Sequence, residues 1–114
     1  MVVSYNDPAA DFRLAMTGVC SDVLVAEEDQ GHIIGSVLVG HDGHRGWLYY
    51  LATATRAQGS GVGRKLVEAA EQWLRERGAV KAQLLVRERN SGVVSFYERL
   101  GYEVTPRVLM SKCL

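Results

Sequence analysis

The sequence predicts an α/β fold built on a mixed, mainly antiparallel sheet with one parallel strand-helix-strand unit. Three observations support this. Short runs rich in β-branched residues fill the first half of the chain, helical periodicity replaces them after residue 61, and another strand-like run follows that helix. The 114 residues, 47% of them hydrophobic, suit a single globular domain spanning residues 1–114.

The first half is expected to hold one helix and three strands. Asp7 as N-cap, Pro8 in the first turn and Gly18 as the stop mark the helix. The strand-like runs cover residues 22–28, 32–40 and 47–53, with turns at 29–31 and 41–46. Connections this short join antiparallel neighbours, so we expect a three-stranded meander.

In the second half of the chain the spacing of the apolar residues changes from strand-like to helical. Apolar residues recur at helical spacing from Val62 to Leu74, and Gly78 follows as a C-terminal stop. A strand is expected at 81–87, which would lie parallel to the strand at 47–53 after a right-handed crossover. A second helix is expected at 91–100, and then a β-like terminal stretch at 102–112, interrupted by Pro106.

Composition excludes several classes of partner. Thirteen basic residues balance thirteen acidic ones, so no overall field draws the chain to nucleic acid or to an anionic membrane. No apolar run reaches the roughly 18 residues that span a bilayer, and the amino end lacks signal-peptide features, which predicts a cytoplasmic protein. Cys20 and Cys113 fit no metal-ligand spacing, so we expect free thiols and no metal site.

A glycine-rich loop, Gln58-Gly-Ser-Gly-Val-Gly63, separates the third strand from the long helix. Unpaired N–H groups and the positive end of the helix dipole bind phosphate at such a junction, and glycines let the backbone approach the anion. Arg56, Arg64 and Lys65 add positive charge nearby. For the glycines alone, a tight turn that binds no ligand is an equal alternative.

Two other phosphate-binding loops do not match. A P-loop needs Lys and then Ser or Thr after its last glycine, but Arg64, Lys65 and Leu66 follow here. A dinucleotide fingerprint needs a third glycine where Arg64 stands, and its fold needs more sheet than one crossover unit provides. A dinucleotide-binding protein therefore ranks third among the functions considered.

Two segments resemble the signatures of GNAT acetyltransferases. Gln58-x-x-Gly61-x-Gly63 resembles the family's Gln/Arg-x-x-Gly-x-Gly/Ala loop, and it too lies between a strand and a helix. Ser95-Phe-Tyr-Glu-Arg-Leu-Gly-Tyr-Glu103 resembles the second signature, Phe-Tyr-x-x-x-Gly-Phe/Tyr. The resemblance covers roughly residues 7–112, and Asp42–Gly46 followed by Tyr49-Tyr50-Leu51 is similar to one small bacterial branch.

The resemblance implies a coenzyme site for acetyl-CoA as cosubstrate and an amine as acceptor. Pantetheine would pair with the backbone of a bulged strand at Leu51, Ala52 and Thr53, for which a plain strand is the alternative. Asn90 would contact the coenzyme, and it could equally be the N-cap of the second helix. The pyrophosphate would bind at Gln58, Gly59, Ser60, Gly61, Val62, Gly63 and Arg64.

The resemblance also implies catalytic roles. Tyr97 matches a tyrosine that protonates the departing thiolate, and a phenol with a reference pKa near 10 is neutral and able to do so. A packed core aromatic beside Phe96 is the alternative. The glutamate that many members use to take the amine's proton is replaced by Leu85, which leaves His44, Asp42, Glu88 or a water chain. Polar turn residues are the simpler explanation of His41, Asp42 and His44.

The amino end is expected to lack the family's first strand and helix. An exposed sheet edge in so small a domain predicts a homodimer. The predicted function is transfer of an acetyl group from acetyl-CoA to a primary amine, and the alternative is a CoA-binding regulatory or structural module without turnover.

Overall fold

The computed structural model describes residues 8–87 and 90–114. Asp7, the predicted N-cap, and Glu88, one of the four candidates for the base, lie outside these residues. The chain divides into two compact units, residues 1–84 and residues 85–114, and each is described on its own. The single-domain assignment stays a prediction.

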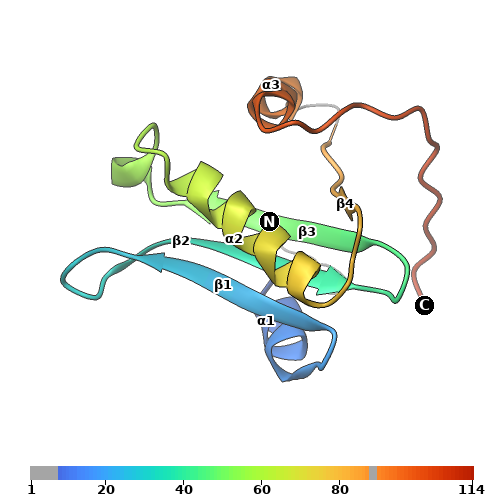
Figure 1. The fold of residues 1–114 in the computed structure, drawn as a ribbon, viewed down its shortest axis with the longest axis horizontal. Helices are drawn as coiled ribbons and strands as arrows, with labels where there is room; N and C mark the ends of the chain where they lie inside the picture. Colours follow the sequence, from blue (N-terminus) through green and yellow to red (C-terminus); the bar gives the residue numbers. More distant parts are fainter. Residues whose placement is uncertain (1–7, 88–89) are drawn as a thin grey trace. The chain divides into compact units, whose positions relative to one another are not determined.

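The first unit contains a four-stranded sheet in the order β1-β2-β3-β4 (Figure 1). β1 (Ser21–Glu27), β2 (Ile33–His41) and β3 (Gly46–Thr53) form the predicted antiparallel meander, and β4 (Ala82–Gln83) runs parallel to β3. The predicted fold class, a mixed and mainly antiparallel sheet with one parallel pair, is confirmed.

Two helices cover opposite faces of this sheet (Figure 1). α1 (Pro8–Thr17) begins at the proline and ends before Gly18, as predicted, and α2 (Val62–Glu76) connects the loop after β3 to β4. Because strand side chains alternate between faces, β2 serves both helices. A Cβ added at Gly35 would lie 2.8 Å from a methyl group of Leu66 on α2. Leu38 is an odd number of residues from Gly35 and therefore lies on the other face of the sheet. There it lines a depression together with residues of α1.

The core lies between the sheet and α2. Its buried side chains come from alternate positions of β2 and β3 and from one stripe of α2. The helix lies so close to the sheet that a Cβ at Gly46 would come within 2.5 Å of Leu74. The principal members of this core are Val37, Val39, Leu48, Leu66, Val67, Ala70, Trp73 and Leu74.

A β-bulge interrupts β3 at its middle. Leu38 pairs with Tyr49 and Ser36 pairs with Ala52, so that Tyr50 and Leu51 together oppose the single residue Val37. Tyr50 has φ 53°, and it is the one non-glycine residue with positive φ among those the structure describes. A bulge of this kind bends the strand and redirects its side chains. It divides β3 into a segment near the β2–β3 turn and a segment near the glycine loop.

β4 is much shorter than the predicted strand at 81–87. Its ladder with β3 consists of the pairs Gly46–Ala82 and Trp47–Gln83. The bulge in β3 begins three residues after Trp47 and bends the strand, so that a straight β4 cannot stay paired with it. The β-branched pattern alone could not predict where this pairing ends.

The second unit contains α3 (Ser91–Arg99) and an irregular terminal segment. The prediction of a β-like stretch at 102–112 is wrong, because these residues form no strand. A strand needs a partner, and residues 85–114 contain no second strand within their described part. Pro106 also removes a backbone donor. The side chains of Val108 and Met110 are accordingly 89% and 87% exposed.

Candidate coenzyme site and its surroundings

The glycine loop follows a short 3-10 helix and contains two residues in the left-handed conformation. The 3-10 helix spans Thr55–Ala57, and Gly59 and Gly61 then adopt φ values of 82° and 88°. Gly61 is the N-cap residue of α2. A residue with a side chain rarely adopts this conformation, so the backbone itself requires glycine at both positions. The spacing recognised in the sequence therefore has a direct conformational cause.

The space above this loop is open. Apart from the glycine itself and its two chain neighbours, no heavy atom of the described chain lies within 4 Å of a Cβ built on Gly59 or on Gly61. The first N–H groups of an α-helix have no intrahelical partner, and at α2 no N-cap side chain binds them. An open backbone surface with outward N–H donors at the positive end of a helix dipole suits a phosphate group.

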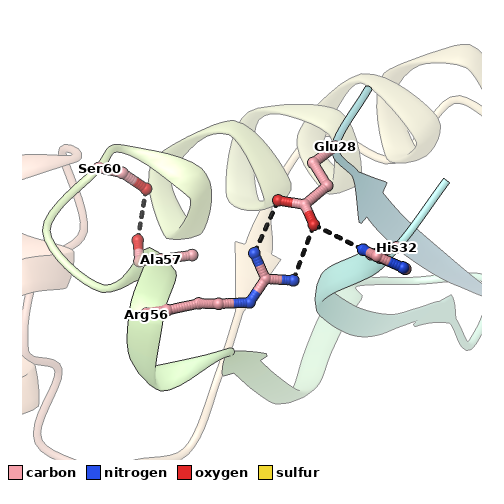
Figure 2. Close-up of polar contacts among 5 residues, drawn as sticks. All are labelled: Glu28, His32, Arg56, Ala57 and Ser60. Carbon is pink, nitrogen blue, oxygen red and sulfur yellow. Dashed lines mark hydrogen bonds and ion pairs between the residues drawn. The ribbon is translucent and has the colours of Figure 1, made fainter. Parts of the chain in front are cut away.

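The three predicted cations differ in their partners. Arg56 forms a two-pronged ion pair with Glu28, with Nη1–Oε2 and Nη2–Oε1 distances of 2.7 and 2.9 Å (Figure 2). Arg64 Nε lies 3.0 Å from Glu68 Oε1. Lys65 forms no ion pair with any residue that the structure describes. Lys65 is therefore the cation most available to an anionic ligand.

The Glu28–Arg56 pair ties the loop to the β1–β2 turn. His32 contributes a third member, its Nδ1 lying 2.9 Å from Glu28 Oε1 (Figure 2). The hydrogen bonds from Arg56 and then from His32 hold the pKa of Glu28 below its usual value. Ser60 closes the loop by donating its hydroxyl to the carbonyl of Ala57 (Figure 2). No local pattern in the sequence indicates Glu28, because its partner lies 28 residues away.

The strand segment assigned to pantetheine begins within the bulge, at Leu51. Ala52 and Thr53 pair with Ser36 and Gly35 of β2 on one edge. On the other edge, the described ladder between β3 and β4 ends at Trp47. One side of Leu51–Thr53 therefore lacks a strand partner within the described chain, which leaves its backbone groups for an extended ligand to pair with.

The second unit holds Asn90 and Tyr97. Asn90 occupies the N-cap position of α3, but its side chain makes no capping hydrogen bond. Tyr97 is buried, and its ring makes edge-on contacts with Phe96 and Tyr102 at centroid distances of 5.0 and 5.7 Å. Burial raises the pKa of the Tyr97 phenol, which keeps it in the protonated form that can donate. Its assignment as the acid stays a prediction.

Comparison with known proteins identifies the family. The model of the acetyltransferase (GNAT) family matches residues 4–102. The chain belongs to the GNAT acetyltransferase family. An acetyltransferase of Pectobacterium atrosepticum is 39% identical to it over 110 residues, which cover 96% of this chain and 77% of that protein.

Solved structures show the same GNAT fold. AAC(6')-Iy, in complex with a bisubstrate analogue, matches with a TM-score of 0.81 and 18% identity over 93% of this chain and 78% of that one. An aminoglycoside acetyltransferase from an uncultured soil metagenomic sample, in complex with sisomicin, matches with a TM-score of 0.77 and 18% identity. The match covers 95% of this chain and 74% of that one. At this identity the likeness shows the fold alone.

Asp42 is poorly suited to be the base of a GNAT reaction. Its Oδ1 accepts hydrogen bonds from the backbone N–H groups of Arg45 and His44 at 2.7 and 2.8 Å. Its Oδ2 accepts one from the indole of Trp47 at 3.3 Å. These contacts, led by that from Arg45, lower the pKa of Asp42 to about 2. A carboxylate stabilised so strongly in its charged form is a weak proton acceptor.

His44, in the segment between β2 and β3, stays a candidate for the base. His44 Nδ1 lies 3.3 Å from Arg45 Nη1, and His41 Nδ1 accepts a hydrogen bond from the N–H of Gly43 at 3.4 Å. Both contacts are those of turn residues, and no described cluster of His, Cys, Asp or Glu could hold a metal ion. Leu85 is 56% exposed and cannot ionise. None of the described helices is long and apolar enough to cross a bilayer.

The bulge makes a contact with α1 that was not predicted from the sequence. The hydroxyl of Tyr50 donates to Asp11 Oδ2 on α1 at 2.6 Å. Asp11 lines a depression on this face of the sheet together with Trp47 and Tyr49 of β3. Asp11 and Tyr50 are 39 residues apart, and no local pattern pairs them.

Proposed function

We propose that this GNAT chain transfers the acetyl group of acetyl-CoA to a primary amine by direct attack on the thioester. The observation that carries the proposal is the succession of a bulged strand with one unpaired edge, a glycine loop with open space above it, and an uncapped helix. These three features suit the successive parts of the coenzyme, an amide-containing arm followed by a pyrophosphate.

The proposed coenzyme contacts follow the chain in order. The pantetheine amides pair with the backbone of Leu51, Ala52 and Thr53. Asn90 contacts the coenzyme through a side chain that does not cap its helix. The pyrophosphate binds along the loop and the first turn of α2, from Gln58 through Gly59, Ser60, Gly61, Val62 and Gly63 to Arg64. The N–H groups of Gln58 and Ser60 already donate to the carbonyls of Thr55 and Ala57, so the anion binds N–H groups of the other residues.

The chemistry needs a neutral amine and an acid. The amine nitrogen attacks the thioester carbonyl carbon, a C–N bond forms and the C–S bond breaks, and the thiolate takes a proton from the Tyr97 phenol. The proton lost by the amine passes to His44, to Glu88 or to a water chain, because the lowered pKa of Asp42 makes it a weak base and Leu85 cannot accept a proton. The complex of AAC(6')-Iy with a CoA bisubstrate analogue supports this type of reaction on the same fold.

A CoA-binding module without turnover is the second candidate. Leu85, in the place of the family's usual glutamate, favours it. We would measure acetyl-CoA binding by calorimetry, with NAD as the control ligand, and thiol release with a panel of amines. Acetyl-CoA binding with amine-dependent thiol release supports the enzyme. Binding without release supports the module, and no binding of acetyl-CoA contradicts both.

We also propose a homodimer. β1 is an outer strand of the described sheet, and Val25 within it is 46% exposed. An exposed strand edge favours pairing with a second chain. Light scattering at micromolar concentration should give about twice the 12.6 kDa mass of the chain. The mass of a single chain would contradict this assembly.

A further inference from the structure

The α1 face of the sheet carries a shallow depression of about 340 Å³. A volume of this size lies at the lower end of the roughly 300–1,000 Å³ typical of small-molecule sites. No lysine or arginine is among the described residues that line it. Its lining combines hydrocarbon, aromatic rings and two carboxylates, contributed chiefly by Asp11, Leu14, Leu38, Asp42, Trp47 and Tyr49.

Two aromatic rings form one wall. Trp47 and Tyr49 lie two residues apart on β3 and share a face, with ring centroids 6.3 Å apart and planes inclined by 19°. The hydrogen bond from the Trp47 indole to Asp42 fixes one end of this wall. Aromatic faces pack against flat organic groups and attract cations.

The two carboxylates are not equivalent. Asp42 uses both oxygens to bind the β2–β3 turn and the indole. Asp11 accepts one hydrogen bond through Oδ2, from Tyr50, and no other described residue pairs with it. Asp11 is only half-buried. Asp11 therefore keeps one oxygen and its negative charge available to an incoming cation.

The depression adjoins the proposed coenzyme strand. Tyr49 lines the depression, Leu51 begins the segment assigned to pantetheine, and Tyr50 lies between them in the bulge. A non-glycine residue at φ 53° is under backbone strain, and such residues concentrate at functional sites. An amine held against Tyr49 would thus lie near the end of the strand segment assigned to the acyl donor.

We propose that this depression is the acceptor site, and that it selects amines whose ammonium group pairs with Asp11 while an apolar or aromatic body packs against Trp47 and Tyr49. The proposal rests on the proposed function and adds the substrate class and the specificity residues. A net positive acceptor should bind better than its zwitterionic counterpart, because a second carboxylate would face Asp11 and Asp42 at close range.

Tryptamine and tryptophan provide a matched pair of probes, since they share the indole and the amine and differ by one carboxylate. The chain has two tryptophans, so a ¹⁵N-labelled sample gives two indole N–H signals, and Trp47→Phe identifies that of Trp47. We expect tryptamine to shift the Trp47 signal and to bind at least about tenfold more tightly than tryptophan. Equal affinities, or no shift at Trp47, would overturn the proposal.

Asp11→Asn tests the ion pair. It should weaken tryptamine binding about tenfold and raise the KM for tryptamine while leaving the affinity for acetyl-CoA unchanged. Asp29→Asn, in the β1–β2 turn and outside the depression, removes the same charge as a control. Leu14→Lys, at a position 75% exposed, puts a cation into the lining without disturbing the core and should also weaken binding.

The outcomes separate the two proposals. If acetyl-CoA binds but Asp11→Asn and Leu14→Lys both bind tryptamine like the unaltered protein, the acceptor site is wrong and the coenzyme site stands. If acetyl-CoA fails to bind while tryptamine binding at Trp47 depends on Asp11, the depression is a cation site and the acetyltransferase proposal fails, and the acceptor role falls with it.

Discussion

The two faces of the sheet in the first unit are built from alternate residues of the same strands, yet they differ in packing. On the α2 face, Val37 and Val39 are fully buried, and a Cβ at Gly46 has no room. On the α1 face, Tyr49 remains 43% exposed and Leu14 is 75% exposed beside an open depression. The α2 face thus supplies most of the burial that stabilises this unit, and the α1 face keeps surface that a ligand can contact.

The largest expected effect is on stability. Leu66→Ala, on the α2 face, should lower the free energy of unfolding by about 2–5 kcal/mol, because it leaves a cavity against the sheet. Leu14→Ala, the matched change on the α1 face, should stay within about 0.5 kcal/mol. Urea unfolding followed by circular dichroism measures both. Similar losses in the two variants would contradict the division of roles between the faces.

The next effect is on coenzyme binding at the amino end of α2. Gly61→Val should reduce acetyl-CoA affinity by a factor of about a thousand or more, since the side chain would fill the open space above the loop. Valine at φ 88° also strains the backbone, so a matched control is needed. Gly78→Val, at φ 84° just beyond the carboxyl end of α2, carries the same strain away from the loop. It replaces Gly61→Val's site at one end of the helix by a site at the other.

Calorimetry on folded samples of both glycine variants decides the assignment. Loss of binding in Gly61→Val alone supports the phosphate site. Equal losses in the two variants would instead attribute the effect to backbone strain, and unchanged affinity in Gly61→Val would rule out the loop.

The features that could be predicted from the sequence are those that depend on residues close together in the chain. Pro8, Gly18 and Gly61 act within one helical turn, and the structure places helix ends beside all three. The loop glycines and the bulge expected from the family resemblance are also present. The helix ends and the loop glycines are local signals carried by a few adjacent residues, whereas the bulge was expected only from the resemblance.

What the sequence missed involves partners far apart in the chain. Glu28 with Arg56 and Asp11 with Tyr50 are separated by 28 and 39 residues, and many carboxylates could have been chosen for either pair. The strand predicted at 81–87 is shorter than expected, and the one predicted at 102–112 is absent, for a related reason. Val104 and Val108 have the right side chains for a strand, but strand formation depends on a partner edge that periodicity does not reveal.

A further prediction concerns the second unit and separates packing from chemistry. Tyr97→Phe should lower turnover roughly ten- to a thousandfold while leaving acetyl-CoA affinity nearly unchanged, because the hydroxyl acts on the developing thiolate. Phenylalanine keeps the ring contacts with Phe96 and Tyr102, so stability should change little.

Steady-state rates across pH with the best amine measure this effect. The raised pKa of Tyr97 places the loss of the protonated acid above the phenol's usual value, so the alkaline decline of the unaltered enzyme should flatten in the variant. Turnover equal to that of the unaltered enzyme would make Tyr97 a packing residue.

The smallest expected effect lies at the ion pair between the β1–β2 turn and the glycine loop. Glu28→Gln removes the charge that Arg56 binds and should weaken acetyl-CoA binding about threefold, because the loop loses one anchor while its glycines and the start of α2 remain. Arg56 is exposed and Glu28 is only half-buried, which keeps the effect small. Arg56 and His32 lower the pKa of Glu28, so the pair should persist as pH falls past the usual carboxylate range and be lost only below the lowered value. The affinity of Glu28→Gln for acetyl-CoA should lack that dependence on acidic pH.

Asp29→Asn, one residue away and outside the pair, controls for the loss of charge. A threefold loss in both variants would attribute the effect to the general field around the loop and not to the Arg56 anchor.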